Sequence, residues 1–166
     1  AFWGLAVRAS LRRRKYGASH LVLDRTPAVL GERLTGKVES GVPKATVPRD
    51  GFQVRLQCVH RWKESSHHGA SGSERRTHRR REVLWQDERR EPGHITARSP
   101  SFEVAVKFSL PAEQPATTLG GSRDGITWEL VVSAAMPGLD YAASFELPVL
   151  APDLTSDTVR KVVQER

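Results

Sequence analysis

A turn that runs directly into an alternating strand is the feature of this sequence that most limits its fold. Residues 26–40 read TPAVLGERLTGKVES, and in this stretch Leu34, Gly36 and Val38 alternate with polar neighbours. A hydrophobic period of two predicts a β-strand with one apolar face. Gly31 suits a turn position with a positive φ angle, and Gly36 suits a strand position that another backbone approaches closely.

The same alternation recurs along most of the chain. It predicts strands at about residues 19–23, 33–39, 52–63, 82–90, 102–110, 126–132 and 141–149, with turns rich in Pro and Gly between them. Such a series, with no helical segment of ordinary length, predicts an all-β fold, an antiparallel β-sandwich of about seven strands. We expect the core to contain Phe52, Leu56, Phe102, Val106, Phe108, Trp128, Leu130 and Phe145.

The amino-terminal residues differ in composition from this body. Residues 1–7 are apolar and include Trp3, and a basic cluster follows them: Arg12, Arg13, Arg14 and Lys15. Trp followed by Arg and Lys is typical of the cytoplasmic end of a transmembrane helix, and seven residues are far short of the ~20 that span a bilayer. We therefore expect a basic leader (1–17) that is the exit of a helix beginning before Ala1, then a sandwich domain (18–151) and a tail (152–166).

The alternative for the leader is an amphipathic or unstructured basic segment. Either form places Trp3 and the basic cluster beside an anionic membrane surface, because each basic residue near anionic lipid contributes about 1 kcal/mol of attraction. The prediction is a membrane-associated protein whose domain lies on the cytoplasmic side.

The net charge of +7 comes mostly from this leader. Five of the 26 basic residues lie in the first fifteen positions, which leaves 21 basic against 19 acidic residues in the rest of the chain. A nearly neutral body lacks the broad basic surface of a nucleic-acid-binding domain, so we do not expect nucleic acid to be the main partner.

Residues that carry chemistry are sparse. Cys58, the only cysteine, falls on the apolar side of its strand, which predicts a buried and unreactive thiol. Four histidines near one hairpin (His60, His67, His68 and His78) lack the spacing of a zinc site, so we expect no metal. Asp87 and Glu88 are adjacent on a strand and point to opposite faces. With no catalytic motif present, we expect neither an enzyme nor a cofactor.

An arginine-rich stretch is the best local candidate for binding. Residues 64–81 have no aliphatic periodicity, which predicts a mobile hairpin loop. Its return side carries five arginines: Arg75, Arg76, Arg79, Arg80 and Arg81. Guanidinium groups bind carboxylates and phosphates, so an acidic partner, a lipid headgroup or a phosphate fits here. The alternative is a solvated hairpin whose charges pair with Glu74, Glu82, Asp87 and Glu88.

Four stretches in sequence resemble strands of arrestin-like β-sandwich domains. They are PAVLGERLTGKV near residue 30, FEVAVKFSLP from Phe102, DGITWELVVSA from Asp124 and FELPVL from Phe145. The leader, the VLWQDE segment and the ending PGLDYAASFELPV also resemble the bacterial membrane-anchored group DUF3592, in which transmembrane helices precede a soluble β domain. Both resemblances imply a sandwich, but no arrestin phosphate-sensing residue carries over to this chain.

These observations favour a non-enzymatic protein-interaction or scaffolding module at the cytoplasmic face of a membrane, with an unidentified protein partner. The alternative is phospholipid or nucleic-acid binding through the hairpin from Arg75 to Arg81.

Overall fold

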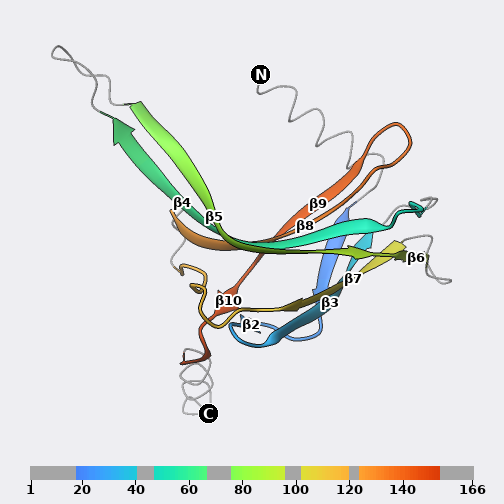
Figure 1. Cartoon of the computed structure of the whole chain (residues 1–166), viewed down its shortest axis with the longest axis horizontal. Helices are drawn as coiled ribbons and strands as arrows, with labels where there is room; N and C mark the ends of the chain where they lie inside the picture. Colours follow the sequence, from blue (N-terminus) through green and yellow to red (C-terminus); the bar gives the residue numbers. More distant parts are fainter. Residues whose placement is uncertain (1–17, 41–46, 67–75, 96–101, 120–123, 154–166) are drawn as a thin grey trace.

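The computed structural model describes residues 18–40, 47–66, 76–95, 102–119 and 124–153. These residues form two four-stranded sheets that pack face to face, with neighbouring strands antiparallel (Figure 1). One sheet has the order β1 (Ser19–Leu23), β3 (Arg33–Ser40), β7 (Phe102–Ser109), β6 (Gly93–Ile95). The other has the order β5 (Arg76–Glu91), β4 (Phe52–Ser66), β8 (Gly125–Ala134), β9 (Tyr141–Leu147). The predicted all-β antiparallel sandwich is confirmed.

A third, short strand pair joins segments near the amino-terminal and carboxy-terminal ends of the domain's sequence. In it β2 (Ala28–Val29) lies parallel to β10 (Val149–Leu150). This pair was not predictable from the sequence, because two residues are too few to show a hydrophobic period.

The core lies between the sheets and consists of the inward side chains of each strand. Seven of the eight predicted core residues are buried there: Phe52, Leu56, Phe102, Val106, Phe108, Trp128 and Leu130. Phe145 is half-buried and packs against the margin of the core. Phe145 lies on β9, an outer strand of its sheet with a neighbour on one side only, whereas Tyr141 and Leu147 of the same strand are buried.

Aromatic rings connect the two sheets. Phe52 on β4 stacks on Phe102 on β7, with ring centroids 4.8 Å apart, and Tyr141 meets both rings edge-on. The Tyr141 hydroxyl is also 2.9 Å from the Ser19 hydroxyl, which links β9 to β1 across one side of the sandwich. These contacts fix how one sheet lies on the other.

The two glycines singled out in the sequence have the predicted roles. Gly31 adopts a φ angle of 82°, which L-residues with side chains rarely adopt. A Cβ atom on Gly36 would lie 2.4 Å from the carbonyl oxygen of Val22 on the neighbouring strand. The first glycine therefore makes the turn, and the second permits β1 and β3 to approach.

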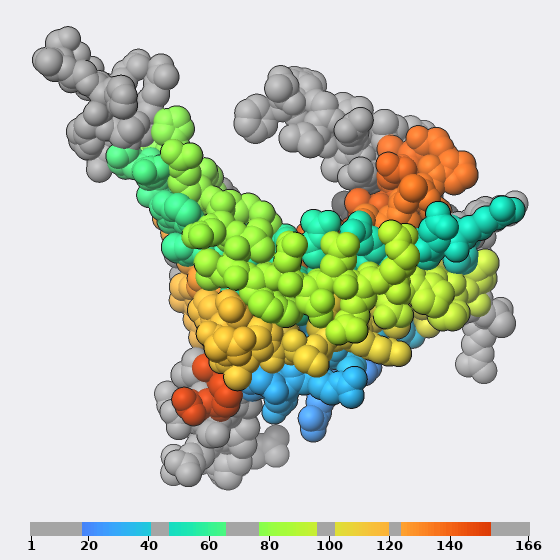
Figure 2. All heavy atoms as spheres, in the orientation of Figure 1, coloured from blue at the N-terminus to red at the C-terminus, as the bar shows by residue number. Residues whose placement is uncertain are grey.

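The hairpin of β4 and β5 is longer than predicted. Residues 64–66 and 76–81, expected in a mobile loop, are paired strand residues, and the register continues to Ser66 opposite Arg76. The prediction failed because neither face of this part is covered, so it carries no apolar alternation. We call residues 62–66 and 76–80 the distal ribbon; it projects beyond the sandwich (Figures 1 and 2).

A shift in the strand register lies between the sandwich and the distal ribbon. Cys58 faces Trp85 but Val59 faces Val83, so Leu84 has no partner in the pairing. An extra residue of this kind bends a strand and increases its twist. This shift accounts for the curvature with which the hairpin leaves the sheet in Figure 1.

Candidate functional site

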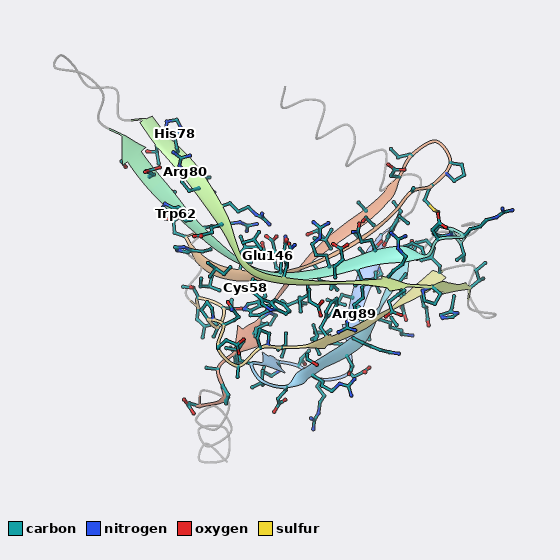
Figure 3. All side chains as sticks on the ribbon, viewed as in Figure 1. Cys58, Trp62, His78, Arg80, Arg89 and Glu146 are labelled. Atoms are coloured by element: carbon teal, nitrogen blue, oxygen red, sulfur yellow. The ribbon has the colours of Figure 1, made fainter. Side chains whose placement is uncertain are left out.

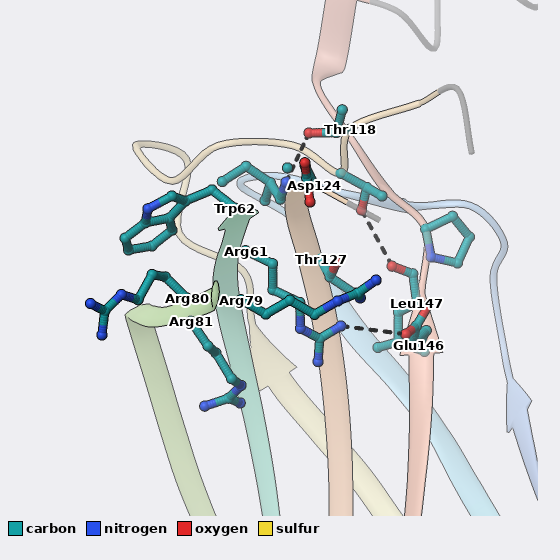
Figure 4. A pocket seen from close by; sticks show the side chains of 14 residues that line it. Arg61, Trp62, Arg79, Arg80, Arg81, Thr118, Asp124, Thr127, Glu146 and Leu147 are labelled. Atoms are coloured by element: carbon teal, nitrogen blue, oxygen red, sulfur yellow. Dashed lines mark hydrogen bonds and ion pairs between the residues drawn. The ribbon is translucent and has the colours of Figure 1, made fainter. Parts of the chain in front are cut away.

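An open cleft lies at the base of the distal ribbon, where β8 begins and its pairing with β4 stops. Its volume is about 800 Å³. Residues from five parts of the chain line it (Figure 4): Arg61 and Trp62 from β4, Arg79, Arg80 and Arg81 from β5, Thr117 and Thr118, Asp124 to Thr127 around the start of β8, and Glu146 to Pro148 at the end of β9. We call it the basic cleft.

Strand pairing decides which way each basic side chain points. Arg61 lies opposite Arg81 and Lys63 lies opposite Arg79, and residues two apart on a strand share a face. These four side chains therefore lie on one face of the hairpin, and Trp62 and Arg80 lie on the other. Figure 4 shows Arg61 and Arg79 extending toward the Glu146 side of the cleft.

A buried carboxylate fixes two of these arginines. Glu129 on β8 forms ion pairs with Arg61 and with Arg81, the latter at 3.2 Å between Nη2 and Oε2. The Gln57 amide donates a further hydrogen bond of 2.9 Å to Oε2. Only 7% of Glu129 is exposed, and the three donors compensate the cost of burying its charge. Both guanidiniums are thereby held in place before anything binds.

The other two arginines of the cleft are less constrained. Arg80 pairs with Glu64 at 2.6 Å, but both side chains are more than half exposed, so this pair stabilises the fold little. Arg79 is exposed and forms no ion pair with any other residue in the described ranges. The lining residues include four arginines and two carboxylates, and one of these, Glu146, pairs with Arg61 at 3.7 Å. Since Glu129 and Glu64 also pair with lining arginines, Arg79 is the arginine of the cleft that has no ion pair among the described residues.

Three of the five arginines predicted as a binding site line this cleft. Arg79, Arg80 and Arg81 are there; Arg76 begins β5, and its side chain and all of Arg75 lie outside the described residues. The membrane-proximal candidates Trp3, Arg12, Arg13, Arg14 and Lys15 also lie outside them.

Two of the four acids proposed as partners for these arginines, Asp87 and Glu88, have other roles, and Glu74 lies outside the described residues. Asp87 pairs with Arg89 at 3.3 Å. Glu88 accepts hydrogen bonds from Gln53 and Arg55, which lower the pKa of its carboxyl group. The carboxylates that hold the arginines, Glu64 and Glu129, come instead from β4 and β8.

Sequence reasoning did not identify Arg61, Glu129 or Glu146 as members of the site. Glu129 follows Trp128 in an otherwise apolar strand, and an acid at such a position was the available signal. Its partners could not be inferred, because they depend on which strands are neighbours.

The remaining reactive groups have structural roles. Cys58 is fully buried, and burial raises the pKa of its thiol from 9.0 to about 11. Little thiolate is therefore present at neutral pH, as predicted. Figure 3 shows Cys58 between the sheets, while Trp62, His78 and Arg80 lie on the hairpin outside them. The His60 ring stacks on the Trp62 ring, with ring centroids 4.8 Å apart.

The predicted lack of a metal site is tested only in part. In the described ranges no group of three or more His, Cys, Asp or Glu side chains could hold a metal ion. His67 and His68 fall outside those ranges. Within the same ranges, no helix is both long enough and apolar enough to cross a membrane.

Comparison with known proteins assigns no family to the chain. No family model and no curated protein matches it, so the resemblance to the DUF3592 group gains no support. Among solved structures it is similar to Spo0M, a sporulation control protein from Bacillus subtilis, with 18% sequence identity and a TM-score of 0.49. That match covers 88% of this chain and 54% of Spo0M, so the chain spans about half the length of that protein. The arrestin-like assignment within the sandwich class therefore stays a prediction from the strand motifs.

Proposed function

We propose that this chain is a non-enzymatic protein-interaction module, and that its basic cleft binds an acidic segment of a partner protein. The observation that carries the proposal is the set of arginines on one face of the hairpin. Arg61 and Arg81 are fixed by Glu129, and beside them Arg79 has no carboxylate partner in the described residues. A site with oriented cations and an unpaired one attracts an anionic ligand.

The spacing of the cations favours an extended acidic segment over a compact phosphate. Arg79 and Arg81 are two residues apart on one strand, a separation of about 6.5–7 Å between their Cα atoms. Carboxylates at alternate positions of an extended peptide have the same separation. A single phosphate requires cations that converge on one point, whereas Arg80 extends from the opposite face.

The membrane location remains a proposal from the sequence. Trp3 and the basic cluster that ends at Lys15 motivate it, and a module held beside anionic lipid would meet its partner at the cytoplasmic surface. This part of the proposal is independent of the cleft.

Reversing the charge of Arg79 tests the proposed function. The probe is a short soluble peptide in which glutamate alternates with valine, and its affinity is measured by titration calorimetry at low and high salt. We expect Arg79→Glu to weaken binding about tenfold, or ~1.4 kcal/mol, because one attraction becomes a repulsion. Added salt should weaken binding by the unchanged chain.

The matched control is Arg33→Glu on β3. Arg33 is also exposed, but it lies in the other sheet, so the same change of net charge should leave the affinity within about twofold. Vesicles containing phosphatidylserine and a DNA duplex serve as competing ligands. The proposal is wrong if the peptide does not bind, or if vesicles or DNA bind instead and Arg79→Glu abolishes that binding.

A further inference from the structure

The two sides of β4 differ in how far they are paired. On one side β5 accompanies β4 over its whole length, from Phe52 opposite Glu91 to Ser66 opposite Arg76. On the other side β8 accompanies it only from Gln53 to Arg61, which lies opposite Gly125. Beyond Arg61, no described residue pairs with β4 on that side. Figure 1 shows the hairpin continuing alone.

The local backbone explains why β8 does not continue alongside. Gly125 has a φ angle of 130°, and a Cβ atom there would lie 2.6 Å from the Thr118 hydroxyl oxygen. The chain therefore turns out of the strand direction at Gly125 and packs on Thr118, whose hydroxyl accepts a hydrogen bond of 2.8 Å from the Ile126 amide. The basic cleft occupies this place, bordered by Trp62, Gly125 and Ile126.

An open strand edge offers backbone hydrogen bonds to another strand. In an antiparallel pair successive residues direct their N–H and C=O groups alternately to the two sides, so the side of residues 62–66 away from β5 presents donors and acceptors that no described residue pairs. Extended peptides bind such edges by adding a strand. From these features we propose that the acidic partner segment adds as a β-strand to the open edge of β4 at residues 62–66, in line with β8.

The side chains along this edge determine which sequence fits. Every second side chain of an added strand would lie beside Lys63, on the face that also carries Arg61 and Arg79. The side chains between them would lie on the opposite face, beside Trp62. On the Trp62 face the charge of Glu64 is already balanced by Arg80. The site therefore selects an extended segment in which acidic residues alternate with apolar or β-branched ones. A second basic ribbon of this chain would be repelled, which disfavours pairing between copies.

This inference rests on the proposed function, and backbone methylation of the peptide tests it separately. Two derivatives of the glutamate–valine peptide are compared with the parent peptide: one is N-methylated at the glutamates and the other at the valines. In a strand these two sets of N–H groups point to opposite edges. Strand addition requires only one edge, so one derivative should lose binding by at least about tenfold, since two or more hydrogen bonds are removed, while the other stays within about threefold.

Each outcome decides between the claims. A loss confined to one derivative supports strand addition. Equal binding by both derivatives, or an equal loss in both, overturns strand addition but leaves the acidic-segment function standing. A parent peptide that does not bind at all overturns the proposed function and this inference with it.

Discussion

Replacing Trp128 with alanine is expected to lower the free energy of unfolding by about 3–5 kcal/mol. The Trp128 side chain is fully buried, and its ring lies 5.6 Å from that of Trp85 on the neighbouring hairpin. Its indole N–H donates a hydrogen bond of 3.0 Å to the carbonyl oxygen of Pro115, in the segment that covers this end of the core. The substitution removes a large apolar volume and leaves that carbonyl with only the weak hydrogen bond from the Cys58 thiol, at 3.9 Å. Urea unfolding followed by circular dichroism measures the change.

Trp62→Ala is the matched control for this prediction. Trp62 is the same residue type on the neighbouring strand, but it lies half-buried at the base of the distal ribbon and contacts His60. The Trp62→Ala change should lower the free energy of unfolding by about 1 kcal/mol or less, because the Trp62 side chain is only half-buried and lies outside the core between the sheets. Similar losses for both variants would contradict the assignment of the core to the space between the sheets.

Replacing Glu129 with alanine is expected to lower the free energy of unfolding by about 2–4 kcal/mol. The change removes the carboxylate shared by Arg61 and Arg81 and the acceptor of the Gln57 amide. Arg61 then keeps only its longer ion pair with Glu146, at 3.7 Å. The loss should be below that for a fully buried ion pair, since the two arginine side chains are 34% and 44% exposed and water screens them in part.

Glu64→Ala provides the comparison, because Glu64 also holds an arginine of the basic cleft. Both members of its pair with Arg80 are more than half exposed, so the loss should be about 1 kcal/mol or less. The same urea titration applies to both variants. Equal effects would mean that Glu129 does not organise the arginines as the structure indicates.

The sandwich itself was largely predictable because one face of each strand is buried. Leu34 and Val38, and likewise Phe102 and Val106, are buried while the residues next to them are partly or fully exposed, and burial of one face imposes this period directly. The pairing of strands was not predictable in the same way. It depends on contacts between segments far apart in the sequence, as when Phe52 meets Phe102 across the two sheets.

The distal ribbon and the basic cleft were harder to predict for a related reason. Residues 64–66 and 76–81 form strands without any apolar period, because both faces of that ribbon are open. The arginine cluster was visible in the sequence, but its partners Glu64 and Glu129 were not, since they lie on β4 and β8. The composition of the chain showed that the site would be rich in arginine. Only the order of the strands shows which segments line the cleft.

Backbone amide chemical shifts of the isotope-labelled chain, followed during titration with the glutamate–valine peptide, show whether an acidic strand binds at the basic cleft. We expect the largest changes in the distal ribbon, at Arg61 and Arg81, and in the first residues of β8 from Gly125 to Thr127. We expect small changes on β1 and β3, which lie in the other sheet. Changes concentrated on β1 and β3, or no change at a peptide concentration that saturates binding, would contradict binding at the basic cleft.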